Sequence, residues 1–248
     1  MSICDHKLIS ERYFFPRPGS VADVKVAVSG ATLACASNNG GHAQTLLHFH
    51  GNGEIVDDYV PGFPELMDGL HLNTFFAEYR GYGGSTGTPL LATMLGDVDA
   101  LVEAAGGPEN LIVFGRSIGS IYAIETARRY PQIAGLVLES GIANVLERIL
   151  LRASPSEMGA SPDEVRAAFA EHFDHHAKLS KVTCPTLILH AEHDHLVDKS
   201  HAELNAASVG GPCKLVILPR GDHNSIFFEN REQYLAELKS FAEDLRSH

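Results

Sequence analysis

A serine flanked by glycines is the part of this sequence best suited to covalent chemistry. The segment Gly115-Arg-Ser-Ile-Gly119 follows an apolar run at residues 111–114 and opens a stretch with helical periodicity at residues 117–130. A hydroxyl on such a strand-to-helix turn is exposed, and the helix N-terminus favours the negative charge that develops when it attacks a carbonyl carbon. The sequence therefore predicts Ser117 as a nucleophile.

A second segment, Gly83-Gly-Ser-Thr-Gly87, matches the same pattern in a different setting. Ser85 lies in a glycine-rich loop that is followed by Pro89, with no helical segment directly after it. This context is typical of a turn or of a helix-capping hydroxyl. We expect Ser85 to be structural.

A serine hydroxyl is a weak nucleophile near neutral pH, so a histidine must accept its proton and a carboxylate must orient that histidine. Among the 14 histidines, His223 follows the last predicted strand and precedes the C-terminal helix. This position is at the carboxyl edge of the sheet, where open α/β sheets bind ligands. The nearby carboxylates leave several candidates for the acid: Asp194, Asp198 and Glu192 after the seventh predicted strand, and Glu139 at the end of the sixth.

Eight short aliphatic and β-branched runs predict the strands that position these residues. From the third run onward, segments with helical periodicity separate the strands, which indicates a mostly parallel sheet flanked by helices, and so an α/β fold. The first two runs, joined by Ser29-Gly30, predict an antiparallel hairpin at the sheet edge. The strands are expected at residues 24–28, 31–36, 45–50, 73–78, 111–114, 135–139, 186–190 and 214–218, with helices among residues 90–105, 117–130 and 202–208.

An insertion at about residues 141–182 separates the sixth and seventh predicted strands. It is too long for one crossover helix and carries two helical patterns, at residues 142–151 and 161–173. We expect a short helical cap within a single domain that covers residues 1–248. Ile142 and Leu146 lie on an apolar stripe of the first pattern, which lines either an acyl pocket or the core.

Four segments of this chain resemble the α/β-hydrolase superfamily, and within it the Bem46-like serine hydrolases. They span about residues 45–225 and include the nucleophile segment, in the order serine, acid, histidine that this superfamily shows. In one departure, Glu78 stands where similar proteins often have aspartate, a position that is not catalytic in the family pattern. The other three segments are Phe49-His-Gly-Asn-Gly-Glu54, Tyr79-Arg-Gly-Tyr-Gly-Gly-Ser-Thr-Gly87 and Gly221-Asp-His-Asn224.

The resemblance implies a complete catalytic site. It assigns Ser117 as nucleophile, His223 as general base and Asp194 as the acid, with Glu139 as the alternative acid. It also points to the backbone N–H groups of Asn52 and Ile118 as an oxyanion hole, which stabilises the tetrahedral intermediate. The implied reaction is hydrolysis of a carboxyl ester or thioester through an acyl-enzyme. A peptidase or amidase with the same triad, or a non-catalytic binding protein of this fold, are the alternatives.

Six histidines gather in two parts of the chain and suggest zinc as an alternative. A serine triad needs no metal, so we expect solvated histidines, no metal site and no cofactor. These residues are His172, His175, His176, His190, His193 and His195.

Composition and charge disfavour several classes of binding partner. A formal net charge of −12 disfavours nucleic acid and anionic membranes, which leaves a small-molecule substrate. The four cysteines are widely spaced and are interpreted as reduced thiols, and the N-terminal segment lacks the apolar run of a signal peptide. We expect a cytoplasmic protein without integral membrane association. The short cap favours dissolved substrates with short to medium acyl chains over emulsified triglyceride.

Overall fold

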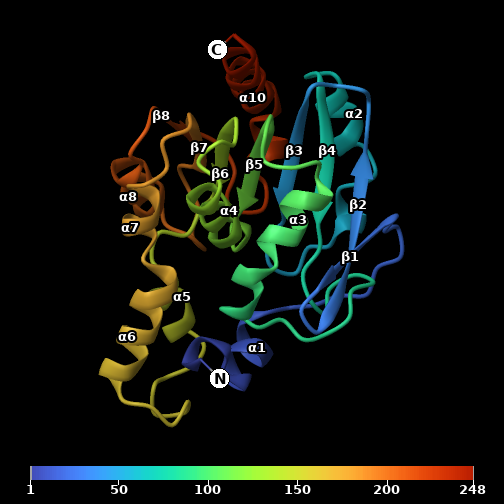
Figure 1. Ribbon diagram of the computed structural model, residues 1–248. Helices are drawn as coiled ribbons and strands as arrows, with labels where there is room; N and C mark the ends of the chain where they lie inside the picture. The colour runs from blue at the N-terminus through green and yellow to red at the C-terminus, as the bar shows by residue number, and fades with distance from the viewer. Residues whose placement is uncertain (1, 248) are drawn as a thin grey trace.

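All eight predicted strands form in the computed structural model, which describes residues 2–247 (Figure 1). They build one sheet in the order β1-β2-β4-β3-β5-β6-β7-β8. The hairpin of β1 and β2 and the pair β2–β4 are antiparallel, and every later pairing is parallel, as predicted. The strands are β1 (Val24–Val28), β2 (Ala31–Asn38), β3 (Gln44–Phe49), β4 (Leu72–Ala77), β5 (Leu111–Arg116), β6 (Gly135–Glu139), β7 (Thr186–Ala191) and β8 (Cys213–Leu218).

Helices cover both faces of the sheet and bury its central strands. Successive residues of β5 alternate between the two cores, Val113 facing one and Ile112 the other, as side chains of a strand must. One core packs on α3 (Val98–Ala104), α4 (Gly119–Arg129), α7 (His175–Leu179) and α8 (Ser200–Ser208). The other packs on α2 (Phe63–Asp68), α9 (Ile226–Glu229) and α10 (Arg231–Arg246).

The helix expected across residues 90–105 is instead two shorter elements. A 3-10 helix, η3 (Thr93–Gly96), precedes α3, and a glycine at their junction weakens helix continuity. The carboxylate of Asp5 accepts hydrogen bonds from the N–H of Ala92 at 2.7 Å and of Thr93 at 3.2 Å. These contacts cap the start of η3 and attach it to the N-terminal segment.

The insertion forms α5 (Val145–Leu150), α6 (Pro162–Phe173) and, near its end, α7. The N-terminal residues form η1 (Ile3–Asp5) and α1 (Lys7–Tyr13), which the sequence analysis did not predict. Element η1 packs against α6, and Figure 1 shows α1, α5 and α6 at the same end of the molecule. The cap is therefore built from two distant parts of the chain. Short η2 (Val56–Asp58) follows β3.

Among residues 2–247, no helix combines the length and the apolar composition required to cross a membrane.

Candidate active site

Ser117 occupies a sharp turn between β5 and α4. Its backbone has φ of 52°, in the left-handed region that residues with a side chain rarely adopt, and its N–H donates to the carbonyl of Glu139 at 2.8 Å. A Cβ at Gly115 would lie 2.5 Å from the Cβ of Ala123, and one at Gly119 would lie 2.1 Å from the carbonyl oxygen of Phe49. Both glycines of the predicted motif are therefore needed for close packing around the serine.

The structure brings the three predicted triad residues into one hydrogen-bonded chain. The Oγ of Ser117 lies 2.9 Å from Nε2 of His223, whose Nδ1 lies 2.7 Å from Oδ2 of Asp194. All three side chains are buried, with Ser117 at the bottom of a cavity that reaches the surface. This arrangement can transfer a proton from the hydroxyl to the imidazole while the carboxylate holds the ring.

Asp194 is held by the turn that follows β7. Its Oδ1 accepts the N–H groups of Leu196 at 2.9 Å and Val197 at 2.8 Å. Burial acts to raise the pKa of Asp194, but the hydrogen bond and charge of His223, with the Val197 N–H, outweigh it and leave the pKa lowered. The carboxylate is thus ionised, as an orienting acid requires.

Arg116, the residue before Ser117, fixes the loop that carries His223. Its Nη2 donates to the carbonyl of His223 at 3.1 Å, while its guanidinium pairs with Glu54 at 3.1 Å and Glu139 at 3.3 Å. Sequence reasoning missed this residue because a guanidinium in the second position of Gly-x-Ser-x-Gly carries no signal of its own. Asp222 further ties the loop by accepting the N–H of Asn224.

The alternative acid, Glu139, does not contact the histidine. It pairs with Arg116 and accepts the hydroxyl of Tyr234, and burial raises its pKa, against the charge of Arg116. Ser85, from the second Gly-x-Ser-x-Gly segment, accepts a hydrogen bond at its Oγ from the N–H of Ala34 at 2.8 Å, which fits the expected structural role. The remaining carboxylate candidates are also engaged elsewhere, Glu192 with Lys199 and Asp198 with the N–H of Ser200.

The loop after β3 places Asn52 in the same cavity as Ser117. Within residues 2–247, the backbone N–H groups of Asn52 and Ile118 have no hydrogen-bond acceptor, so both are free to bind a ligand oxygen. The Asn52 side chain is fixed: its Oδ1 accepts the Phe15 N–H at 3.1 Å and the Tyr82 hydroxyl at 2.7 Å, and its Nδ2 donates to the carbonyl of Tyr13. The N-terminal segment therefore holds this loop in place. No sequence motif predicted this contact.

The histidines considered for zinc lie in separate environments. His190 Nε2 bonds the carbonyl of Val197 at 2.8 Å, and His175 Nδ1 bonds that of Ile142 at 2.7 Å. In the described part of the chain, no three His, Cys, Asp or Glu side chains are grouped to hold a metal ion.

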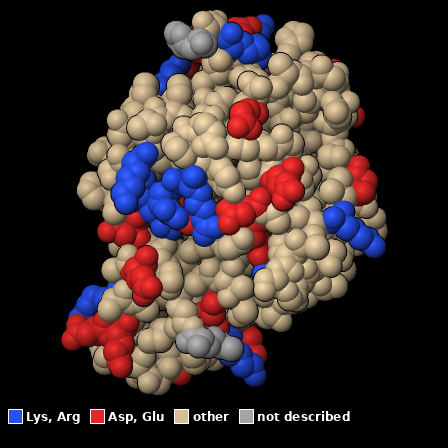
Figure 2. Space-filling view, in the orientation of Figure 1, with Lys and Arg blue, Asp and Glu red and all other residues tan. Residues whose placement is uncertain are grey.

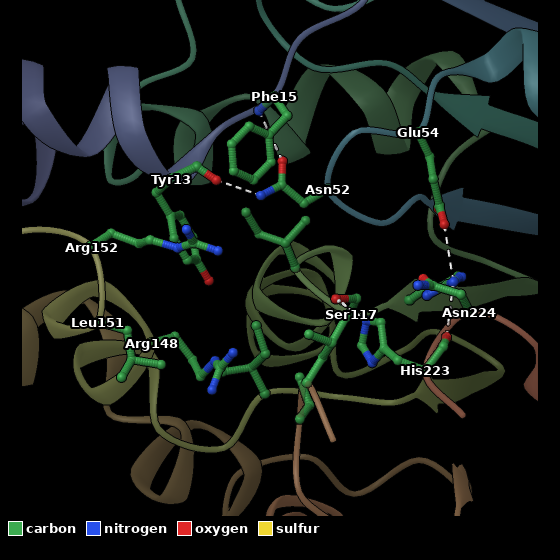
Figure 3. A pocket seen from close by; sticks show the side chains of 15 residues that line it. Tyr13, Phe15, Asn52, Glu54, Ser117, Arg148, Leu151, Arg152, His223 and Asn224 are labelled. Carbon is green, nitrogen blue, oxygen red and sulfur yellow. Dashed lines mark hydrogen bonds and ion pairs between the residues drawn. The ribbon is translucent and has the colours of Figure 1, made fainter. Parts of the chain in front are cut away.

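Ser117 opens into a cavity of about 350 Å³ between the sheet and the cap (Figure 3). Ile142 lines it as expected, but Leu146 packs against the core, because the helix turns that side chain inward. The insertion instead contributes Arg148, Leu151 and Arg152 to the wall, and the N-terminal segment contributes Tyr13 and Phe15. The wall is thus more polar than the predicted apolar stripe.

A second cavity of about 460 Å³ adjoins the first and shares Glu54, Arg116 and Asn224 with it. Its wall is aromatic, and the His48 ring lies 4.3 Å from that of Tyr59, centroid to centroid. The Arg116–Glu54 ion pair lies between the two spaces and bounds the nucleophile's cavity on that side.

Comparison with known proteins agrees with the fold. The family model described as serine aminopeptidase S33 matches residues 40–161. Human alpha/beta hydrolase domain-containing protein 17B is 30% identical over 202 residues, which cover 79% of this chain and 65% of that protein. This chain therefore spans slightly less than two thirds of that relative's length.

Solved structures share the architecture at low sequence identity. Est1E from Butyrivibrio proteoclasticus, with ferulic acid bound, superposes with a TM-score of 0.75 at 18% identity, covering 91% of this chain and all of that one. A hydrolase from Pseudomonas aeruginosa superposes with a TM-score of 0.69 at 24% identity, covering 90% of this chain and 99% of the other. Together with the sheet order, these matches show that the chain has the α/β-hydrolase fold, and the family model and the human relative are similar to it in sequence.

Proposed function

We propose that this protein is a serine hydrolase that cleaves a carboxyl ester or thioester of a dissolved substrate through an acyl-Ser117 intermediate. The observation that carries the proposal is the continuous chain from Ser117 Oγ to His223 at 2.9 Å and from His223 to Asp194 at 2.7 Å, at the base of a cavity. Such a chain activates an otherwise weak nucleophile.

The reaction proceeds in two halves. His223 takes the hydroxyl proton as Ser117 Oγ bonds to the carbonyl carbon, and the resulting oxyanion accepts the backbone N–H groups of Asn52 and Ile118. His223 then gives the proton to the leaving oxygen or sulfur, and the acyl group remains on Ser117. In the second half, His223 takes a proton from water as the water oxygen bonds to the acyl carbon. His223 then returns this proton to Ser117 Oγ as the acyl C–O bond breaks, which releases the acid and restores the serine. Asp194 holds the imidazole tautomer throughout and stabilises the imidazolium.

The size of the cavity supports substrates of short to medium acyl length. About 350 Å³ is at the small end of ligand pockets, and the Arg116–Glu54 pair bounds it. Activity on a p-nitrophenyl ester series from acetate to palmitate is expected to rise, reach a maximum at a short or medium chain, and then fall. A rate that still climbs at palmitate contradicts this limit.

Cleavage of amide bonds is the second candidate. The family model that matches residues 40–161 carries the description of a serine aminopeptidase, and the same triad serves amide hydrolysis. Turnover of aminoacyl p-nitroanilides together with negligible turnover of every ester and thioester would favour this candidate.

The decisive experiment is labelling with a fluorophosphonate, which reacts with an activated serine. Wild-type protein and Ser85→Ala are expected to be labelled, and Ser117→Ala to remain unlabelled. Retention of label in Ser117→Ala, or its loss in Ser85→Ala, would reject Ser117 as the nucleophile.

A further inference from the structure

We propose that the cavity of Ser117 contains a subsite for an anionic oxygen group of the substrate, a carboxylate or a phosphate, formed by Arg148, Arg152 and Tyr13. The inference deepens the proposed function, on which it rests, by naming a charge that the substrate carries.

Two guanidinium groups of the cap line this cavity without a compensating carboxylate. Arg148 is half-buried and Arg152 is exposed, and neither lies within 4.0 Å of an Asp or Glu oxygen in the described residues. Arg152 is instead positioned over the ring of Phe15, at 5.9 Å from its centroid. Both cations therefore retain their capacity to bind an anion.

Most other buried or half-buried cations of this protein are paired. Figure 2 shows Lys and Arg side chains on the face of α3 and α4 gathered directly beside Asp and Glu side chains. On α4, Arg128 and Arg129 pair with the buried Glu125, as does Lys178. Although a net charge of −12 makes carboxylates abundant, none within residues 2–247 pairs with the half-buried Arg148, which differs in this respect from Arg128, Arg129 and Lys178.

Tyr13 supplies a neutral donor at the same place. Its hydroxyl has no partner among residues 2–247, and it lines the cavity from the N-terminal helix. Burial raises the pKa of Tyr13 to about 12, against the charges of Arg148 and Arg152, so the hydroxyl stays protonated. Figure 3 shows this hydroxyl between the two guanidinium groups.

The negative charge already in the cavity does not neutralise these groups. Glu54 lines the cavity, but it pairs with Arg116 at 3.1 Å and accepts the N–H of Gly51 and the hydroxyl of Tyr59. Guanidinium forks match the paired oxygens of carboxylates and phosphates, and hydrogen bonds between charged groups are stronger than neutral ones. A substrate with an anionic group in reach of this site gains binding that a neutral analogue lacks.

The test compares matched esters that differ in one charge. The acyl pair is mono-p-nitrophenyl glutarate and p-nitrophenyl pentanoate, and the leaving-group pair is para-acetoxybenzoate and para-acetoxyacetophenone. We expect wild-type kcat/KM to favour the anionic member of at least one pair by about tenfold, the factor that corresponds to 1.4 kcal/mol, and high salt to reduce this preference.

Variants assign the preference to the subsite. The double variant Arg148→Gln, Arg152→Gln is expected to lower kcat/KM for the anionic ester about tenfold more than for the neutral ester, so that the preference is lost, whereas Arg148→Lys keeps part of the preference. Tyr13→Phe is expected to reduce the preference for the anionic ester by less than the double variant does. The control is Arg166→Gln on α6. The exposed side chain of Arg166 pairs with Asp163 away from the cavity, so this variant is expected to leave kcat/KM unchanged for both esters.

Three outcomes separate the inference from the function on which it rests. Ser117-dependent ester cleavage with no charge preference in either pair, or an equal loss for both members in the double variant, overturns the subsite alone. Absence of Ser117-dependent turnover rejects the proposed function. Calorimetry on Ser117→Ala then tests the subsite directly, with glutarate and inorganic phosphate as ligands. Binding of either anion that is lost when Arg148 and Arg152 are also replaced by Gln supports the subsite and identifies the preferred anion. Binding of neither anion overturns the subsite.

Discussion

His50 directly after β3 and Glu78 directly after β4 form a buried ion pair, with Nε2 and Oε1 2.6 Å apart and side chains 1% and 0% exposed. The second oxygen of Glu78 accepts the N–H of Val56 at 3.0 Å, and Nδ1 of His50 bonds the carbonyl of Gly51 at 2.8 Å. The pair thus joins two strands and fixes the start of the loop that carries Asn52. Glu78 is the residue at which this chain departs from the aspartate of similar proteins.

Removing the charge of Glu78 is expected to destabilise the fold. Glu78→Gln leaves His50 buried without its carboxylate, and breaking such a pair typically costs about 3–5 kcal/mol. Urea unfolding measures the loss, and Glu103→Gln, on the exposed side of α3, is the control and should change the free energy of unfolding by less than about 0.5 kcal/mol. Equal stabilities of the two variants would contradict a structural role of the pair.

The same pair predicts a dependence of stability on pH. Burial acts to lower the pKa of His50, but the charge and hydrogen bond of Glu78 outweigh it and raise the pKa above its ordinary value of 6.5. A raised pKa in the folded state contributes stability in full below the unfolded value, and this contribution is lost as pH rises through the folded value. NMR titration of the His50 ring is expected to give a pKa above 6.5 in the wild type and a lower one in Glu78→Gln. A wild-type value below 6.5 would show that burial dominates.

Variants of the three triad residues should lose far more activity than a variant of the alternative acid, Glu139. Because nucleophile and base act as a unit, Ser117→Ala and His223→Ala are each expected to lower turnover by at least about a thousandfold with near-wild-type folding. Asp194→Asn should lower it by about ten-thousandfold, through the wrong imidazole tautomer. Glu139→Gln should retain most activity, because Glu139 contacts Arg116 and Tyr234. Steady-state kinetics measure the activities, and circular dichroism checks the folding of each variant. A larger loss of turnover in Glu139→Gln than in Asp194→Asn would identify Glu139, at the end of β6, as the acid.

Two glycines offer a matched test of packing at the nucleophile turn. Gly119→Ala places a methyl group 2.1 Å from the backbone oxygen of Phe49, and such overpacking typically costs about 1–3 kcal/mol. At Gly96, a Cβ meets nothing within 4 Å and φ is not positive, so Gly96→Ala is expected to be neutral or to stabilise by about 0.4–1 kcal/mol. Thermal unfolding of the two variants measures the difference, and a stable Gly119→Ala would refute the close approach of β3 to α4.

Chelator treatment provides a test of the proposed metal-free mechanism. Ester turnover is expected to be unchanged after prolonged dialysis against EDTA, because a serine, a histidine and a carboxylate supply the nucleophile and the proton transfers. Loss of activity that zinc restores would require a different reaction scheme.

The strands could be predicted from the sequence by itself because local composition determines them, whereas the complete triad was assigned from the resemblance to a known superfamily. Apolar runs alternating with helical segments specify a parallel sheet, and the chemistry of a carboxyl strand end requires recognisable residues at Ser117 and His223. The choice of Asp194 over Glu139 came from the family order, and the tertiary contacts place Asp194, and not Glu139, on the imidazole.

The walls of the cavity were decided by the tertiary structure. The periodic stripe placed Ile142 and Leu146 on one face, but the orientation of α5 turned Leu146 to the core and Arg148 to the cavity. No local pattern links Tyr13 to Asn52, because their contact joins residues 39 apart in the chain. Helical periodicity reveals which side chains share a face, whereas the surface that the face meets depends on how distant segments pack, and packing between distant segments is a property of the whole fold.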